Sequence, residues 1–161
     1  PATLTLDEAM KLRELVNSTG LAYALTHTYT GYPLVREARD RVMAGELGAV
    51  RKIVVDYSQG WLAGPAENSD NKQAAWRLDP ARAGASCCMG DIGVHAANLA
   101  EYVSGERIES LCADLRATLP GRQLDDDGAV LLRFRGDMRG VLNASQVSAG
   151  EENNQRLRVY G

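Results

Sequence analysis

Aromatic residues, cysteines and long apolar runs are scarce in this chain of 161 residues. Aromatic residues make up 6% of it, and no apolar run approaches the roughly 18 residues of a membrane-spanning helix. The three cysteines, two of them adjacent, are too few for a disulfide framework. No basic and apolar leader is visible, so we expect no signal peptide. Together these absences predict a cytoplasmic protein that does not engage a membrane.

Positive charge is not in excess either. The chain has 18 Lys and Arg against 21 Asp and Glu, a formal net charge of −3, so we expect no nucleic-acid partner. Cys87, Cys88 and His95 are the tempting metal ligands, but they lack C-x-x-C spacing, and we expect no metal. The 45% hydrophobic and 24% charged content is ordinary for a globular domain.

The first thirty residues predict one helix followed by one strand. Thr5 and Glu8 have capping-box spacing, so a helix is expected to begin after Thr5, and Gly20 suits its end. The apolar residues 21–26 then predict a short buried strand. A helix followed by a strand is the end of a β-α-β unit, although no G-x-G-x-x-G phosphate loop occurs in the chain.

The remaining chain predicts helices first and then strands. Helices are expected from Pro33 to Gly45 and within residues 84–105. Strands are expected at residues 50–57, 107–118, 127–134, 139–147 and 154–160, with turn residues at the breaks between the last four. The sequence therefore predicts an α+β fold. Its open, mainly antiparallel, meander-like sheet has helices on one face and follows the last helix-strand unit of a Rossmann-like α/β domain.

The uncovered face of this sheet is expected to carry apolar side chains. Val141, Leu142 and Ala144 lie among neighbours that look exposed, and exposed apolar area of that kind usually marks an interface. We therefore predict a homo-oligomer, a dimer or tetramer, that forms through the open sheet.

Asp91 and His95 are the first candidate for chemistry. They are four residues apart on a predicted helix, so they share a face, and a carboxylate raises the pKa of a neighbouring imidazole and orients the ring. The two residues therefore either form an acid/base pair or belong to a buried helix in which the histidine is hydrogen-bonded and has only a structural role. We expect both side chains to project into one cleft between the end of the 21–26 strand and the sheet.

Two loops are further candidates. His27 and Tyr29 follow the predicted 21–26 strand, at the edge where open α/β sheets bind ligands, and either line a site or form a packed turn. Residues 59–75 form a long irregular segment, which in a compact domain is usually functional or disordered. Trp76 after it is more often a core residue, and Arg77 either holds an anion or faces solvent.

Short motifs along the whole chain follow the order of one known enzyme family. They are T-L-T-L-D-E-A at residues 3–9, Pro33 with Ala38-Arg39, G-E-L-G at 45–48, Trp76-Arg77 with Asp79-Pro80, Gly84, and G-D-I-G-V-H at 90–95. This series resembles the Gfo/Idh/MocA oxidoreductases, the relatives of glucose–fructose oxidoreductase and inositol dehydrogenase. The intervening A-S-C-C-M at residues 85–89 replaces the glycines usual there, which bears on substrate preference.

The resemblance implies an NAD- or NADP-dependent dehydrogenase of a sugar, a polyol or a related substrate. The catalytic residues would be Asp91 and His95, which with His27 and Tyr29 would also bind the substrate. The residues near the cofactor would be Pro1, Trp76 and Arg77. Pro1 resembles the end of the family's Glu-Lys-Pro motif, whose lysine is not in this chain.

The resemblance also implies a division of the chain. Residues 1–30 would be the end of a dinucleotide-binding Rossmann-like domain. Residues 31–161 would be a C-terminally truncated substrate-binding and oligomerisation domain. Without the phosphate loop and the lysine, the chain alone is expected to be inactive. The alternatives are a non-catalytic sugar-binding or oligomerisation domain of the same fold, and a structural scaffold without a small-molecule site.

Overall fold

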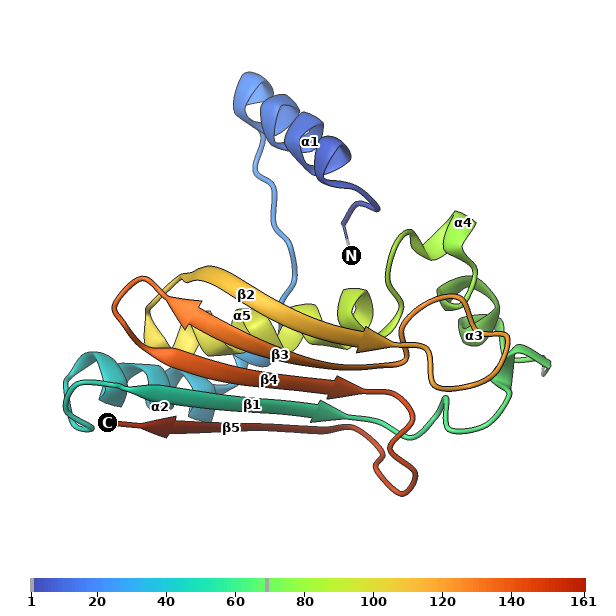
Figure 1. Ribbon diagram of the computed structural model, residues 1–161. Helices are drawn as coiled ribbons and strands as arrows, with labels where there is room; N and C mark the ends of the chain where they lie inside the picture. Colours follow the sequence, from blue (N-terminus) through green and yellow to red (C-terminus); the bar gives the residue numbers. More distant parts are fainter. Residues whose placement is uncertain (1, 69) are drawn as a thin grey trace.

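A five-stranded sheet with helices on one face forms the body of the protein (Figure 1). The computed structural model describes residues 2–68 and 70–161. Its strands are β1 (Lys52–Ser58), β2 (Ile108–Arg116), β3 (Asp127–Phe134), β4 (Arg139–Ser145) and β5 (Asn154–Tyr160). The predicted α+β class and open sheet are confirmed.

The order of strands across the sheet is β2-β3-β4-β1-β5. Strands β2, β3 and β4 are successive antiparallel neighbours, as a meander requires. The predicted meander is wrong beyond β4, because β1 lies between β4 and β5, parallel to β4 and antiparallel to β5. Turn residues show where strands end, but the choice of neighbour depends on packing between distant segments.

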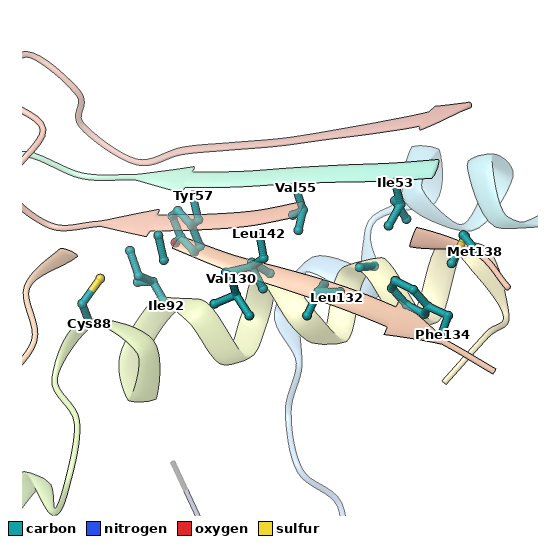
Figure 2. Close-up of a cluster of buried hydrophobic side chains, with 13 residues drawn as sticks. Ile53, Val55, Tyr57, Cys88, Ile92, Val130, Leu132, Phe134, Met138 and Leu142 are labelled. Carbon is teal, nitrogen blue, oxygen red and sulfur yellow. The ribbon is translucent and has the colours of Figure 1, made fainter. Parts of the chain in front are cut away.

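Alternating side chains give the sheet one buried and one open face. Val130, Leu132 and Phe134 of β3 point into the core together with β1 and β4 residues (Figure 2). Leu142 and Ala144 are also in this core, 3% and 1% exposed, so their assignment to the open face is wrong. Successive strand residues face opposite sides, and therefore Val141 is on the open face while its neighbour Leu142 is not.

Two long helices cover the core face. Helix α5 (Val94–Ser104) lies against β1 and β4, and α2 (Pro33–Met43) packs on α5. A π-helical turn, η3 (Met89–Gly93), leads directly into α5, which ends at Gly105 in the left-handed conformation. Shorter elements connect the layers: the 3-10 turns η1 (Thr28–Gly31) and η2 (Ala66–Asn68), and helices α3 (Lys72–Arg77) and α4 (Pro80–Ala83).

Helix α1 (Leu6–Thr19) stands apart from this body (Figure 1). The predicted capping box is confirmed, since the Thr5 hydroxyl accepts from the Glu8 amide and the Glu8 side chain accepts from the Thr5 amide. The strand predicted at residues 21–26 is wrong. This segment is irregular and exposed, and no described segment pairs with it, so its apolar residues have no sheet to join.

Among the residues that the structure describes, no helix is long and apolar enough to cross a membrane.

Candidate functional site

The site is built where the parallel strands β1 and β4 end. Gln59 follows β1 and Gln146 follows β4, and because parallel neighbours end at the same edge, the two glutamines lie side by side. The backbone amide of Gln59 donates to the backbone carbonyl of Ser145, and Gln146 Nε2 donates to Gln59 Oε1 at 3.3 Å. Helix α3 and the loop between β4 and β5 border the same end of the sheet (Figure 1).

The turn that carries Asp91 is held by a buried aspartate. The carboxylate of Asp125 accepts hydrogen bonds from the backbone amides of Cys87 and Met89, at 3.0 and 2.8 Å. The backbone carbonyl of Asp125 accepts from the backbone amide of Cys88. These bonds fix the chain just before η3. Asp91 is therefore in a π-helical turn that continues into α5, so the predicted helix through Asp91 and His95 is present but begins with π-helical geometry.

The Asp91 carboxylate uses one of its oxygens for the protein. Oδ2 accepts from Arg77 Nε at 3.0 Å and from Gln146 Nε2 at 2.8 Å. Oδ1 has no hydrogen-bond partner among the described residues. Asp91 therefore presents one oriented oxygen that is free to accept a hydrogen bond from a ligand.

Arg77 is fixed by more than its ion pair. Its guanidinium lies 4.3 Å from the Trp76 ring and 5.9 Å from the Trp61 ring, and it also donates to Gln73. Of the two sequence-based alternatives for Arg77, the anion it holds is the Asp91 carboxylate of the protein itself. Trp76 is half-buried and donates to Gln73 Oε1 at 3.2 Å. Contact of either residue with a cofactor stays a prediction.

A hollow of about 450 Å³ opens beside Asp91 and Arg77. Its other walls are mostly amide and indole side chains: Gln59, Trp61, Asn71, Gln73, Glu152 and Asn153. Amides offer both donors and acceptors, and an indole offers a flat apolar surface, which together suit a small polyhydroxylated molecule.

His95 stands in a ring cluster next to this hollow rather than among its lining residues. Its imidazole meets the rings of His27 and Tyr29 edge-on, with ring centres 5.7 and 5.3 Å away. The Nδ1 atoms of both histidines are buried and have no hydrogen-bond partner among the described residues. The predicted residues His27, Tyr29 and His95 are thus brought together, and two of them retain unused hydrogen-bonding capacity.

A chain of hydrogen bonds links the ring cluster to the hollow. The Tyr29 and Tyr57 hydroxyls are bonded to each other, and Tyr57 donates to Asn153 Oδ1 at 2.7 Å. Gln59 Nε2 donates to the same Asn153 oxygen at 2.7 Å. Through Gln59 and Gln146 the chain reaches Asp91, so both parts of the site belong to one polar network.

Burial dominates the electrostatics of this cluster. Desolvation lowers the pKa of His95, the nearby His27 lowers it further, and the Asp91 charge only partly opposes them. The expectation that the carboxylate would raise this pKa is therefore wrong in its net direction, although its contribution has the expected sign. His95 is a neutral imidazole at pH 7. Desolvation likewise raises the pKa of the Tyr57 hydroxyl.

The adjacent cysteines have no catalytic character. Both are buried, and desolvation raises the pKa of the Cys87 thiol to about 12. Cys87 Sγ donates to Gln146 Oε1 at 3.5 Å, which makes it part of the packing behind Asp91. Pro1, expected near the cofactor, lies outside the described residues.

The sequence interpretation missed Gln59, Gln146, Asn153 and Asp125. These residues are far apart in the chain and come together only through the β1–β4 neighbourhood, which no local pattern revealed. Gln59 and Gln146 each directly follow an observed strand at an edge where ligands bind, but the strand predicted at residues 139–147 included Gln146, so no clear signal for it was present in the sequence.

Comparisons with known proteins identify a family for most of the chain. The sequence model of the GFO/IDH/MocA C-terminal domain matches residues 35–161. Levoglucosan dehydrogenase from Pseudarthrobacter phenanthrenivorans is 28% identical over 183 residues, which cover 100% of this chain and 45% of that protein.

Solved structures give the same result. An oxidoreductase from Sinorhizobium meliloti is 41% identical, with a TM-score of 0.83, over 100% of this chain and 41% of its own. An inositol dehydrogenase homolog from Azotobacter vinelandii complexed with NAD⁺ is 33% identical, with a TM-score of 0.94, over 100% of this chain and 42% of its own. Its complex with NADH and myo-inositol is 30% identical, with a TM-score of 0.87, over 98% of this chain and 40% of its own. The chain thus spans less than half the length of each relative.

Proposed function

Because this chain belongs to the GFO/IDH/MocA family, we propose that it is part of an NAD(P)-dependent dehydrogenase. The substrate is a sugar, a polyol or a related hydroxyl or carbonyl compound. Oxidoreductases among its relatives support the reaction type, and a relative that binds myo-inositol and another named levoglucosan dehydrogenase support the substrate class.

One observation carries the proposal: an oriented carboxylate is hydrogen-bonded into a polar network beside a hollow, and a half-buried, neutral imidazole contacts the ring of Tyr29 in the same network. Asp91 Oδ1 accepts a hydrogen bond from a substrate hydroxyl, which positions the alcohol. His95 is neutral at pH 7, so it takes the hydroxyl proton during oxidation and returns it during reduction. His27 and Tyr29 complete the wall around that imidazole and contact the substrate.

The nicotinamide cofactor supplies the hydride acceptor when it is bound. The fit of this chain to it is limited to the reactive end, where the buried Nδ1 atoms of His27 and His95 have unused capacity. The sequence contains no G-x-G-x-x-G loop for the phosphates, so we propose that the 161-residue chain is inactive by itself. Pro1, Trp76 and Arg77 remain the proposed contacts near the cofactor.

The division of the chain follows from the same proposal. Residues 1–30 are the end of a dinucleotide-binding domain, and residues 31–161 are the domain that binds substrate and forms oligomers. The three cysteines are free thiols, which suits the reducing conditions of the cytoplasm.

A homo-oligomer through the open sheet face is the further part of the proposal. The row Val54, Val141, Leu131 and Cys112 runs across β1, β4, β3 and β2 on this face, and Leu131 is 62% exposed. A second copy that contacts this row buries apolar area which is otherwise in water. Val141, Leu131 and Cys112 of this row and their basic neighbours border a hollow of about 490 Å³.

The test is turnover of the full-length parent with NAD⁺ or NADP⁺ and a panel of inositols, anhydrosugars and aldoses. We expect oxidation of at least one of them, and a loss of about 10²–10⁴-fold in turnover for His95→Asn. The melting temperature of the same preparation separates chemistry from folding.

The alternative, a non-catalytic sugar-binding domain, predicts a different outcome. Wild-type parent would then bind a polyol in calorimetry without reducing either cofactor. Normal turnover of a well-folded His95→Asn parent would instead contradict the acid/base role and leave the fold assignment intact.

A further inference from the structure

We propose that Gln146 is a positioning residue that fixes the rotamer of Asp91, so that Oδ1 faces the hollow and a substrate hydroxyl. This role rests on the proposed dehydrogenase function. Gln146 lies in the turn after β4, outside the Asp-x-Gly-x-His motif. In the proposed reaction it touches neither substrate nor cofactor.

The backbone of Gln146 is held on both sides. Its amide donates to the carbonyl of Asp126 at 2.8 Å, and its carbonyl accepts from the amide of Leu62 at 2.9 Å. Its side chain is 0% exposed. The amide group of Gln146 therefore reaches Asp91 from a fixed starting point within the core.

The orientation of this side-chain amide is determined by its own partners. Nε2 donates to Asp91 Oδ2 at 2.8 Å and to Gln59 Oε1 at 3.3 Å, which uses both of its hydrogens. Gln59 is oriented in turn, because its Oε1 accepts from Trp61 Nε1 at 3.0 Å and its Nε2 donates to Asn153. A flipped Gln146 amide would place its oxygen against the Asp91 carboxylate.

Arg77 alone does not give the same precision. It shares Asp91 Oδ2 with Gln146, but its side chain is 22% exposed and belongs to the short helix α3. Solvent reaches this part-buried ion pair and screens it partly, whereas the Gln146 side chain is fully buried. Gln146 thus decides which Asp91 oxygen serves the protein, and the other oxygen is left for the ligand.

Removing the donor while keeping the volume tests this role. In the full-length parent, Gln146→Met should lower kcat/KM by about 10- to 100-fold, because small errors in position of a reacting group are costly. Calorimetric affinity for the best polyol substrate should also weaken. The matched control is Gln155→Met, since Gln155 Nε2 is buried on β5 but has no hydrogen-bond partner among the described residues. That control should keep wild-type kinetics.

Gln146→Glu adds a readout that a merely structural role would not move. A second carboxylate beside Asp91 disfavours the ionised pair, so the acid limb of the kcat/KM profile should shift to higher pH. If the wild-type parent oxidises a polyol and Gln146→Met has the same kinetics as Gln155→Met, the role of Gln146 is overturned while the proposed function stands. A wild-type parent that oxidises no polyol would overturn the proposed function and the role together.

Discussion

His95 illustrates how one residue connects folding with chemistry. Its pKa is lowered in the folded protein by desolvation and by His27, so the unfolded chain binds a proton more readily below about pH 6.5, the ordinary histidine pKa. Stability rises with pH wherever the unfolded state holds more protons. The contribution of His95 is therefore fully present above pH 7 and is lost as the pH falls towards its folded pKa.

We predict that the free energy of unfolding of this chain decreases between pH 7 and pH 5, and that His95→Asn reduces this decrease. Urea titrations at several pH values measure it, and the other titrating groups are common to both proteins. A slope unchanged by the substitution would mean that the imidazole titrates alike in the folded and unfolded states.

At the scale of elements, a buried arginine ties two connecting segments together. Arg122 has a side chain that is 0% exposed and forms ion pairs with Asp126 and Glu67, both at 2.7 Å. It also donates to the carbonyls of Leu62 and Gly64. The loop after β1 is thereby attached to the connection between β2 and β3, which holds the wall of the site.

Removing this arginine should be costly. Arg122→Met leaves the buried carboxylate of Asp126 unpaired, and we expect a loss of about 3–5 kcal/mol in the free energy of unfolding. The control is Arg107→Met, because Arg107 pairs with Glu101 with a side chain that is 72% exposed, and a surface pair contributes about 0–1 kcal/mol. Equal losses in the two variants would show that burial does not govern these pairs.

The loop after β1 also depends on one close approach. A Cβ on Gly60 would lie 2.7 Å from the carbonyl oxygen of Ser148 and 3.0 Å from that of Glu151. Because both atoms belong to the backbone, Gly60→Ala should destabilise the chain by about 1–3 kcal/mol and displace Gln59 and Trp61.

Gly64→Ala in the same loop is the matched control, since nothing lies within 4 Å of its Cβ position. Thermal unfolding compares the two stabilities, and a change in the intrinsic tryptophan fluorescence, to which Trp61 and Trp76 contribute, reports the displacement. A Gly60→Ala protein as stable as Gly64→Ala would argue that the two loops separate without cost.

Local patterns predicted the elements of this fold better than their partners. Strands β3 and β5 were predicted with the bounds that the structure has, because alternation and turn residues are local signals. Residues 21–26 failed, since an apolar run becomes a strand only beside another strand. Asp91 and His95 were recognisable by spacing, whereas Gln146 and Asn153 depend on the position of β1 between β4 and β5.

At the scale of the whole molecule, the open sheet face has charges of opposite sign on either side of its apolar row. Lys52, Arg139 and Arg133 are in the neighbouring row on one side. Asp56 and Asp114 are in the row on the other side, which also contains Arg156, and Asp56 pairs with Arg158 at 3.2 Å. In two copies related by a two-fold axis through the apolar row, cations of one face carboxylates of the other. This arrangement favours a self-complementary pair.

We predict that Leu131→Asp converts the proposed homo-oligomer to a monomer, because it places a charge at the centre of the apolar row that a second copy would cover. Light scattering at tens of micromolar measures the mass. Leu34→Asp is the control, since Leu34 is 82% exposed on α2, on the other side of the sheet. A wild-type monomer, or an oligomer that survives Leu131→Asp, would direct attention to another surface.

The place of β1 has a consequence for how the chain folds. Among the described residues it is the earliest strand of the sheet, yet Lys52 pairs with Tyr160 and Ser58 with Asn154 of the latest strand, β5. At a synthesis rate of about 5–20 residues per second, β1 is synthesised several seconds before its neighbours β4 and β5. Strands β2, β3 and β4, in contrast, can pair with one another as they emerge. During translation the strand that leads to Gln59 is therefore exposed and unpaired. The site forms only when β4 and β5 have paired with β1.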